Sequence, residues 1–244
     1  MTTLISKVGS LFSIPIRFSD RLLVTTTSQL EINTPRPFTN WMLEQKLSLG
    51  FMTYQAGKLF LLGLQPNGRL SVFERTFNRC MGVWTNGQTM WISSLYQLWG
   101  LENVLEPDQL ASDYDRLFVS QVDYISADLV IHDVAVEASG CVPFVYTLFS
   151  CLSTFSETDS LVPLWKASII SRLAAEDRRH LKSLALENGE AKYIIAVSQS
   201  DVADGWRYRR HNGGCISKSY LPYFELSVYC SSVDQKHVKK SSSL

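Results

Sequence analysis

The chain alternates short apolar runs with polar turns that contain glycine. Between residues 54 and 70, the sequence YQAGKLFLLGLQPNGRL places an apolar run between Gly57 and the turn Pro66-Asn67-Gly68. An Asn-Gly pair flanked by alternating apolar residues is a strong signal for a β-hairpin. The pattern therefore predicts strands on both sides of Gly57 and a third strand, LSVFER, after the second turn.

The same pattern recurs three times further along the chain. Each copy has a small or apolar stretch, a polar turn with glycine, and an aromatic and β-branched run that ends in Ser or Thr. The turn glycines are Gly87, Gly140 and Gly189, at a spacing of about 50 residues, as in the larger β-propeller repeats. The three copies are CMGVWTNGQTMWISS (80–94), DVAVEASGCVPFVYT (133–147) and SLALENGEAKYIIAVS (183–198).

Further strands are predicted after the hairpins. QLWGLEN and SCLSTFSET follow two of them, and DRLFVSQVDY and SLVPLWKASI fit outer strands. Short strands grouped in repeats of this length predict an all-β, β-propeller-like fold, incomplete at about four blades. A β-sandwich is the alternative, since it also has many short strands, but its sequence lacks such a long repeat.

Two segments favour short connecting helices instead of strands. In PFTNWMLEQKLSLG, Thr39 or Asn40 could cap a helix whose apolar side holds Trp41, Leu43 and Leu47. In SRLAAEDRRHLKSL, Ser171 could cap a second helix, with Glu176 three and four residues before Arg179 and His180.

Charge and hydropathy set limits on the partners. Lysine plus arginine and aspartate plus glutamate each total 23, so the net charge is zero and attraction to nucleic acid or an anionic membrane is not expected. No apolar stretch is long enough to cross a membrane, and the first twenty residues lack a convincing signal-peptide cleavage site. We therefore expect a cytoplasmic protein.

Cysteine, histidine and glycine motifs point to no established chemistry. The five cysteines are widely spaced without a Cys-x-x-Cys pair, which favours free thiols in a reducing compartment: Cys80, Cys141, Cys151, Cys215 and Cys230. Gly57-Lys58 is not a phosphate-binding loop, because Met52 stands where its first glycine would be and Leu59 follows the lysine. A Gly-x-Ser-x-Gly nucleophile elbow is missing as well.

Long blocks of this sequence resemble a bacterial family of conserved hypothetical proteins, a domain of unknown function with a propeller-like repeat. The resemblance covers roughly residues 35 to 214. It implies the propeller-like fold and carries no established activity. The matching blocks are TYQAGKLFLLGL, GRLSVFERTFNRCMG, SSLYQLWGLEN, DLVIHDVAV, TLFSCLSTFSE, ISRLAAEDRRHL and AVSQSDVADGW.

The resemblance divides the chain into an N-terminal segment (1–34), a propeller-like repeat domain (35–215) and an atypical tail (216–244). The tail lacks the repeat pattern and ends in Lys-Lys-Ser-Ser-Ser-Leu. Disorder would explain such an end. Its aromatic content favours instead a frameshift or truncation that replaces further blades. An open ring leaves blade edges unprotected, so we expect self-association of the chain.

Four polar residues are candidates for a ligand site at the mouth of the propeller channel. His132 and Asp133 stand just before a predicted inner strand, VAVE, Arg79 occupies the corresponding position one repeat earlier, and Asp201 follows the next repeat. A metal-assisted hydrolase could use His132 with Asp133 and Asp201 around calcium or another divalent ion. The alternative is that both aspartates bind backbone amides in turns and that His132 is structural.

No catalytic motif is evident, and we expect no cofactor. The sequence therefore predicts a scaffold, or a module that binds an unknown ligand or protein, rather than an enzyme. The metal-assisted hydrolase is the alternative.

Overall fold

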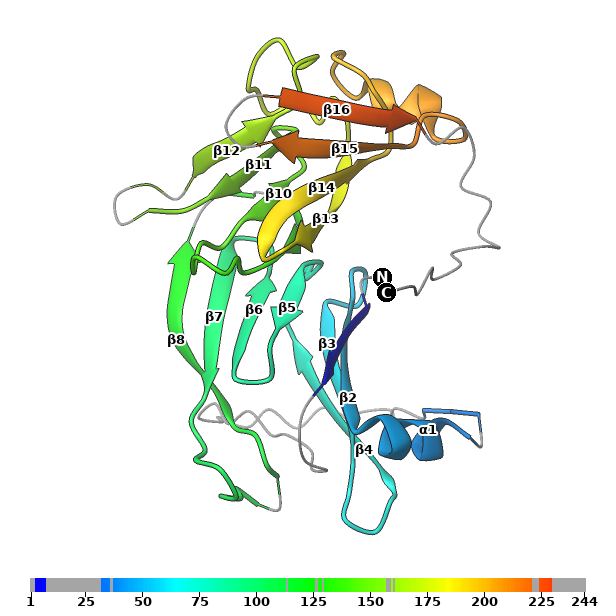
Figure 1. Cartoon of the computed structure of the whole chain (residues 1–244), viewed down its shortest axis with the longest axis vertical. Coiled ribbons are helices and arrows are strands. Elements are labelled where there is room, and N and C mark those ends of the chain that lie inside the picture. The colour runs from blue at the N-terminus through cyan, green and yellow to red at the C-terminus, as the bar shows by residue number, and fades with distance from the viewer. Residues whose placement is uncertain are drawn as a thin grey trace. The chain divides into compact units, whose positions relative to one another are not determined.

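The computed structural model describes residues 3–7, 32–35, 37–112, 114–125, 127–128, 130–156, 159, 161–220 and 224–229. The chain divides into two compact units, Met1–Ser126 and Ala127–Leu244. The first runs from blue to green in Figure 1, and the second from green to red. Each unit holds two four-stranded antiparallel sheets.

The first unit is built from two meanders. One sheet has the order β1-β2-β3-β4 and the other β5-β6-β7-β8. Helix α1 (Phe38–Gln45) precedes β2. The strands are β1 (Thr3–Lys7), β2 (Leu47–Thr53), β3 (Lys58–Leu64), β4 (Leu70–Thr76), β5 (Val83–Thr85), β6 (Thr89–Ser93), β7 (Gln97–Asn103) and β8 (Phe118–Ile125).

The second unit repeats this organisation. Its sheets have the orders β9-β10-β11-β12 and β13-β14-β15-β16, and a short 3-10 helix, η1 (Gly205–Arg209), lies between β14 and β15. The strands are β9 (Ile131–Val134), β10 (Phe144–Tyr146), β11 (Cys151–Thr154), β12 (Val162–Lys166), β13 (Leu181–Glu187), β14 (Glu190–Ala196), β15 (Cys215–Tyr220) and β16 (Phe224–Tyr229).

The repeat found in the sequence corresponds to the hairpins that begin three of the four sheets. Gly87, Gly140 and Gly189 lie in the β5–β6, β9–β10 and β13–β14 turns, all with positive φ. Gly57 (φ 58°) makes the β2–β3 turn, one strand further into its sheet, and its carbonyl accepts the Phe77 N–H at 2.8 Å. Four-stranded meanders of this size are the blades of a propeller. The predicted all-β, propeller-like fold with about four blades is confirmed.

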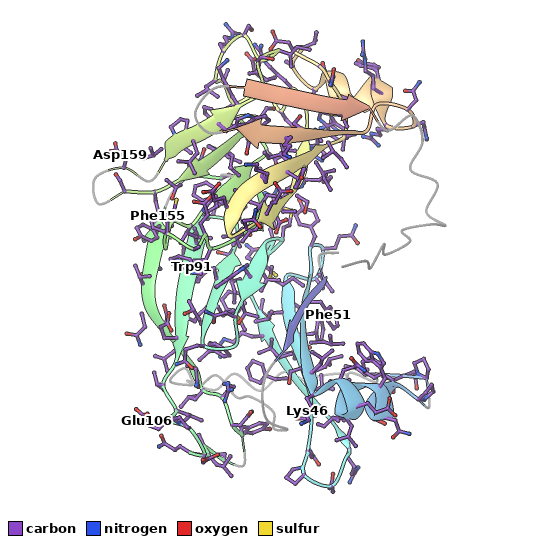
Figure 2. All side chains as sticks on the ribbon, in the orientation of Figure 1. Lys46, Phe51, Trp91, Glu106, Phe155 and Asp159 are labelled. Atoms are coloured by element: carbon purple, nitrogen blue, oxygen red, sulfur yellow. The ribbon has the colours of Figure 1, made fainter. Side chains whose placement is uncertain are left out.

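The core of the first unit lies between its two sheets. Met52 and Leu59, neighbours across β2 and β3, pack in one cluster with Ile92 and Leu101 of the second sheet. On the other side of the first sheet, Phe51 of β2 (labelled in Figure 2) stacks on Phe60 of β3, with ring centroids 5.2 Å apart. Both faces of this sheet are therefore covered, which explains why the LFLL run of β3 is continuously apolar.

Helix α1 forms where the sequence predicts a helix, but the details differ. Pro37 occupies the N-cap position without a side-chain capping bond, so neither Thr39 nor Asn40 is the cap. Met42 is the buried residue, while Trp41 and Leu43 are exposed and Leu47 already belongs to β2. The helix packs on the core through Met42 and the partly buried Phe38, so its apolar side differs from the one predicted.

The second predicted helix is wrong. Residues 171–180 form bends and irregular backbone, and β13 begins at Leu181. The Glu176 N–H donates to Leu148 O at 3.1 Å and to Ala174 O at 2.8 Å, and the Asp177 N–H donates to Leu148 O at 2.8 Å, so neither amide makes the bond to the fourth preceding carbonyl that an α-helix requires. Asp177 and His180 also have positive φ, which a right-handed helix excludes. Tertiary contacts thus override the favourable spacing of charges.

The segment in which the sequence shows no repeat pattern contains β15 and β16, which complete the fourth sheet. The sequence predicts an atypical tail from residue 216, whereas the structure places nearly all of β15 and the whole of β16 in that segment. In β15 polar side chains take buried positions and an apolar one faces solvent: Ser217 and Ser219 are buried, whereas Ile216 is exposed. Both buried hydroxyls are hydrogen-bonded, Ser217 to Arg179 and Ser219 to Ala191 O. Cys230 and the tail beyond it lie outside the described residues.

Candidate functional site

His132 and Asp133 lie on β9, the strand that begins the third sheet, and all four residues of this strand are buried. Asp133 Oδ2 accepts hydrogen bonds from Ser183 Oγ at 2.6 Å and from the Leu184 N–H at 3.0 Å, both on β13. Its Oδ1 accepts the Val134 N–H at 3.0 Å. The carboxylate therefore connects the first strands of two neighbouring sheets.

Burial and hydrogen bonding act on Asp133 in opposite directions. Burial raises the pKa of its carboxyl group, while the hydrogen bonds from Ser183, Leu184 and Val134 lower it. These three hydrogen bonds occupy both oxygens of the Asp133 carboxylate and stabilise its charged form. The arrangement matches the structural interpretation offered by the sequence, with the amides provided by a strand rather than by a turn.

Other hydrogen bonds join the same two sheets. Glu137 Oε1 accepts the Ala191 N–H at 2.8 Å, and Gly189 O accepts the Ala138 N–H at 2.8 Å. Thr147 Oγ1 donates to Leu181 O at 2.7 Å. Asp133 is thus one member of a series of polar links along the boundary of these sheets.

His132 is neutral at physiological pH. Burial lowers the pKa of its imidazole to about 3, and the nearby positive charge of Lys182 adds to this effect. The ring meets His180 edge to face, with centroids 5.1 Å apart. Burial also lowers the pKa of Lys182, against the opposing influence of Asp177.

His180 is the centre of a cluster that the sequence did not identify as a site. Its Nδ1 lies 2.6 Å from Asp177 Oδ2, and its ring stacks on Trp206 with centroids 3.8 Å apart. The guanidinium groups of Arg207 and Arg210 lie 4.6 and 4.8 Å from the centre of the same indole. Within the described part of the chain, the buried Asp177 Oδ1 and Trp206 Nε1 make no hydrogen bond.

Asp201 holds the loop that carries this tryptophan. It accepts the Ser171 N–H at 3.0 Å and pairs with Arg178, whose guanidinium also binds Glu176 Oε2 at 2.6 and 2.8 Å. The hydrogen bonds from Ser171, followed by those from Arg178, lower the pKa of Asp201 to about 2. Asp201 therefore anchors its loop to the 171–180 segment.

Arg79 belongs to the first unit, where its guanidinium donates to the Tyr54 hydroxyl at 3.0 and 3.2 Å. In the second unit, Asp133 and Asp201 engage different partners, β13 for the first and Arg178 with Ser171 for the second. Over the described residues, no group of three or more His, Cys, Asp or Glu side chains is placed to hold a metal ion. The structure thus gives the four candidates separate local partners.

The cluster around Trp206 was hard to recognise because its members are distant in sequence. Trp206 and His180 come from different segments, and each alone resembles an ordinary packing residue. The signal that could have revealed it is the run RYRRH directly after the tryptophan, where three arginines flank a tyrosine without an acidic residue.

Most of the chain matches one protein family. The model of the family described as "Domain of unknown function (DUF4915)" matches residues 36–219. The chain belongs to this family. The resemblance inferred from the sequence, over residues 35–214, is confirmed, and the DUF4915 match extends into β15.

Solved structures resemble this DUF4915 chain only distantly. Virginiamycin B lyase from Staphylococcus aureus, in a structure with quinupristin, is 9% identical with a TM-score of 0.41, and the match covers 76% of this chain and 53% of that one. A streptogramin B lyase is 12% identical with a TM-score of 0.38, covering 76% and 66%. The DUF4915 chain thus spans about half of the first of these. No curated protein matches it in sequence.

Among the helices of the described residues, none has the length and hydropathy needed to cross a membrane.

Proposed function

We propose that this DUF4915 chain is a non-catalytic binding module, a propeller-like scaffold that presents its loops to a ligand or protein partner. The observation that carries this proposal is the hydrogen bonding of the buried Asp133 carboxylate. Oδ2 of this carboxylate accepts two hydrogen bonds from the neighbouring strand β13, Oδ1 accepts the Val134 N–H of its own strand, and the residue is buried. A group engaged in this way supports the sheets, and binding of a metal would break the links between β9 and β13.

Asp201 and His132 support the same interpretation. Asp201 is paired with Arg178, so a cation there would compete with a guanidinium. His132 is buried beside Lys182, and its lowered pKa leaves it unable to hold a proton near neutral pH. A metal-assisted hydrolase built on these three residues is therefore not favoured.

A thermal-shift experiment distinguishes the two functions. The intact chain is melted with calcium, magnesium or zinc and with a chelator, alongside Asp133→Asn and Asp201→Asn. For a binding module, none of the ions raises the melting temperature, and the chelator has no effect. A rise with one ion that disappears in both variants would support the hydrolase instead.

The free thiols bear on location. Cys80, Cys141, Cys151 and Cys215 are not in disulfides. On this basis we propose the cytoplasm, where thiols remain reduced. Association between copies through sheet edges remains a prediction.

A further inference from the structure

A short basic segment stands out on the surface of the second unit. Residues 207–211, which we call the arginine ridge, follow Trp206 on and after η1, drawn as an orange coil in Figure 1. All five side chains are exposed, and Tyr208 is 90% exposed. Tyrosine and arginine are the residues that most often dominate the energy of protein interfaces.

The charge of the arginine ridge is only partly balanced. The chain as a whole is neutral, but the stretch 202–214 contains three arginines and a single acidic residue, Asp204. Asp204 pairs with Arg207 at 3.0 Å, and because both side chains are more than half exposed this pair is weak. Arg209 makes neither an ion pair nor a side-chain hydrogen bond with any residue that the structure describes. Its guanidinium is available to a carboxylate, which it can bind with two parallel hydrogen bonds.

The base of the ridge is rigidly held. Trp206 is 8% exposed and stacks on His180, while Arg210 lies over the indole at 4.8 Å. The Asp204 N–H donates to Glu176 O at 2.9 Å, which ties the loop to the preceding segment. At Gly205 an added Cβ would lie 2.2 Å from Ser200 Oγ, so the backbone approaches Ser200 closely. A segment fixed in advance loses less conformational entropy when a partner binds.

The chemistry of the ridge favours an acidic protein segment over nucleic acid. Nucleic-acid binding usually depends on many phosphate contacts and on a net positive field, and this neutral chain offers three neighbouring guanidinium groups. Bidentate guanidinium groups beside an exposed tyrosine suit a few carboxylates and an apolar contact.

We propose that the arginine ridge is a docking site for a glutamate- or aspartate-rich segment of a partner protein. This inference rests on the proposed binding function and specifies its partner. Arg209 and Arg210 bind carboxylates, and Tyr208 supplies the apolar contact. The His180–Trp206 stack supports the ridge from below and does not touch the partner.

The test measures fluorescence anisotropy of a labelled oligoglutamate peptide with the whole chain. Binding is expected for oligoglutamate and not for oligoglutamine, and it should weaken with added salt because the contacts are exposed. Arg209→Glu should reduce the affinity about tenfold or more, since an attractive contact becomes repulsive. Tyr208→Ala should reduce it by a smaller factor.

Arg69→Glu is the matched control, because Arg69 is an exposed arginine in the β3–β4 turn of the first unit. This variant should bind within about twofold of the original chain, because it makes the same charge change away from the ridge. Equal weakening by Arg69→Glu and Arg209→Glu would overturn the proposal, as would failure of oligoglutamate to bind at low salt. Tighter binding of single-stranded DNA than of oligoglutamate would overturn the choice of a protein partner.

The same samples separate this inference from the broader proposal. If oligoglutamate does not bind and the melting temperature does not depend on metal ions, the proposed docking site is wrong and the proposed binding function still holds. A melting temperature that rises with a metal ion, and no longer rises in Asp133→Asn and Asp201→Asn, would overturn the proposal that the chain is a non-catalytic binding module. Mass spectrometry of the peptide after incubation should show it intact, and metal-dependent cleavage would contradict both proposals.

Discussion

His180 and Trp206 stack face to face, with ring centroids 3.8 Å apart and planes inclined by 16°. His180 immediately precedes β13, and Trp206 lies in η1, between β14 and β15. The stack therefore connects the entry to the fourth sheet with the loop that interrupts it. It also places a largely buried indole beneath the exposed arginine ridge.

We predict that Trp206→Ala loosens this loop. Removing a buried tryptophan side chain should cost about 3 kcal/mol in the free energy of unfolding, and local opening should become easier. Trypsin should then cleave after Arg209 and Arg210 several times faster than in the original chain, as followed by mass spectrometry. Trp41→Ala, which removes an exposed indole from α1, should leave these cleavage rates unchanged. Similar acceleration in both variants would show that the stack does not restrain the loop.

Asp133 provides a second prediction. Asp133→Ala removes the acceptor for Ser183 and Leu184, leaving a buried N–H unpaired, and should lower the free energy of unfolding by about 2–4 kcal/mol. Asp133→Asn keeps an oxygen that can face β13 and should cost less. Urea unfolding measures both. A double-mutant cycle with Ser183→Ala should give a coupling energy of about 1 kcal/mol or more, and additive effects would contradict the direct link.

The buried imidazole of His132 predicts acid sensitivity. In the unfolded chain His132 has its ordinary pKa of about 6.5, whereas in the fold the pKa is about 3. The unfolded state therefore binds more protons between these values, and stability is lost as the pH falls below about 6.5, by at most about 1.4 kcal/mol per pH unit for this group. His132→Phe keeps a ring without a titrating group, so its urea midpoint should fall less between about pH 7 and pH 5.

Asp133 contributes with the opposite sign, because its pKa is raised and the folded state holds its proton more readily. The comparison of His132→Phe with the original chain removes this contribution, since Asp133 is present in both. Equal loss of stability on acidification in the two proteins would contradict a buried neutral His132.

Gly100 gives a prediction for the first unit. A Cβ added to Gly100 on β7 would lie 2.8 Å from Val122 Cγ1 and 3.0 Å from the indole of Trp91, which is labelled in Figure 2. Gly100→Ala should therefore destabilise the chain by about 1–3 kcal/mol, because the packed side chains of Val122 and Trp91 must shift to make room. Gly68→Ala in the β3–β4 turn tests the contribution of positive φ alone, since an added Cβ meets nothing within 4 Å there. Thermal melting compares the two. A smaller loss in Gly100→Ala than in Gly68→Ala would contradict the crowding at β7.

The hairpins could be predicted from the sequence because their signals are local. Glycine at positive φ between two apolar strands leaves a readable pattern, as Gly87 and Gly140 show. The conformation of the segment 171–180 could not be predicted from the sequence, because it depends on hydrogen bonds to Leu148 O, an acceptor far away in the sequence. β15 is hard to predict because two of its buried positions are serines, hydrogen-bonded to Arg179 and Ala191 O, and serines in a sequence are usually taken for solvent-exposed residues.

The candidate site was only partly predictable for a related reason. The sequence predicts a strand at VAVE, just after His132 and Asp133, whereas the structure has the strand about three residues earlier and places both residues on β9. Whether a carboxylate is available for chemistry depends on which groups donate hydrogen bonds to it. Two of the three donors to Asp133, Ser183 and Leu184, lie about fifty residues further on, one repeat away. The run of the arginine ridge can be read in the sequence, but the stacking of His180 on Trp206 beneath it cannot, because no spacing in the sequence brings these two residues together.

The Asp133 link also bears on how the second unit assembles. Asp133 Oδ2 gains its two hydrogen bonds only once β13 has been synthesised and positioned, so the buried carboxylate of the third sheet is fully hydrogen-bonded only when the fourth sheet begins to form. Contacts between residues so far apart close a long loop, which slows folding. The two sheets should consequently form and melt as one cooperative event, although each resembles an independent repeat.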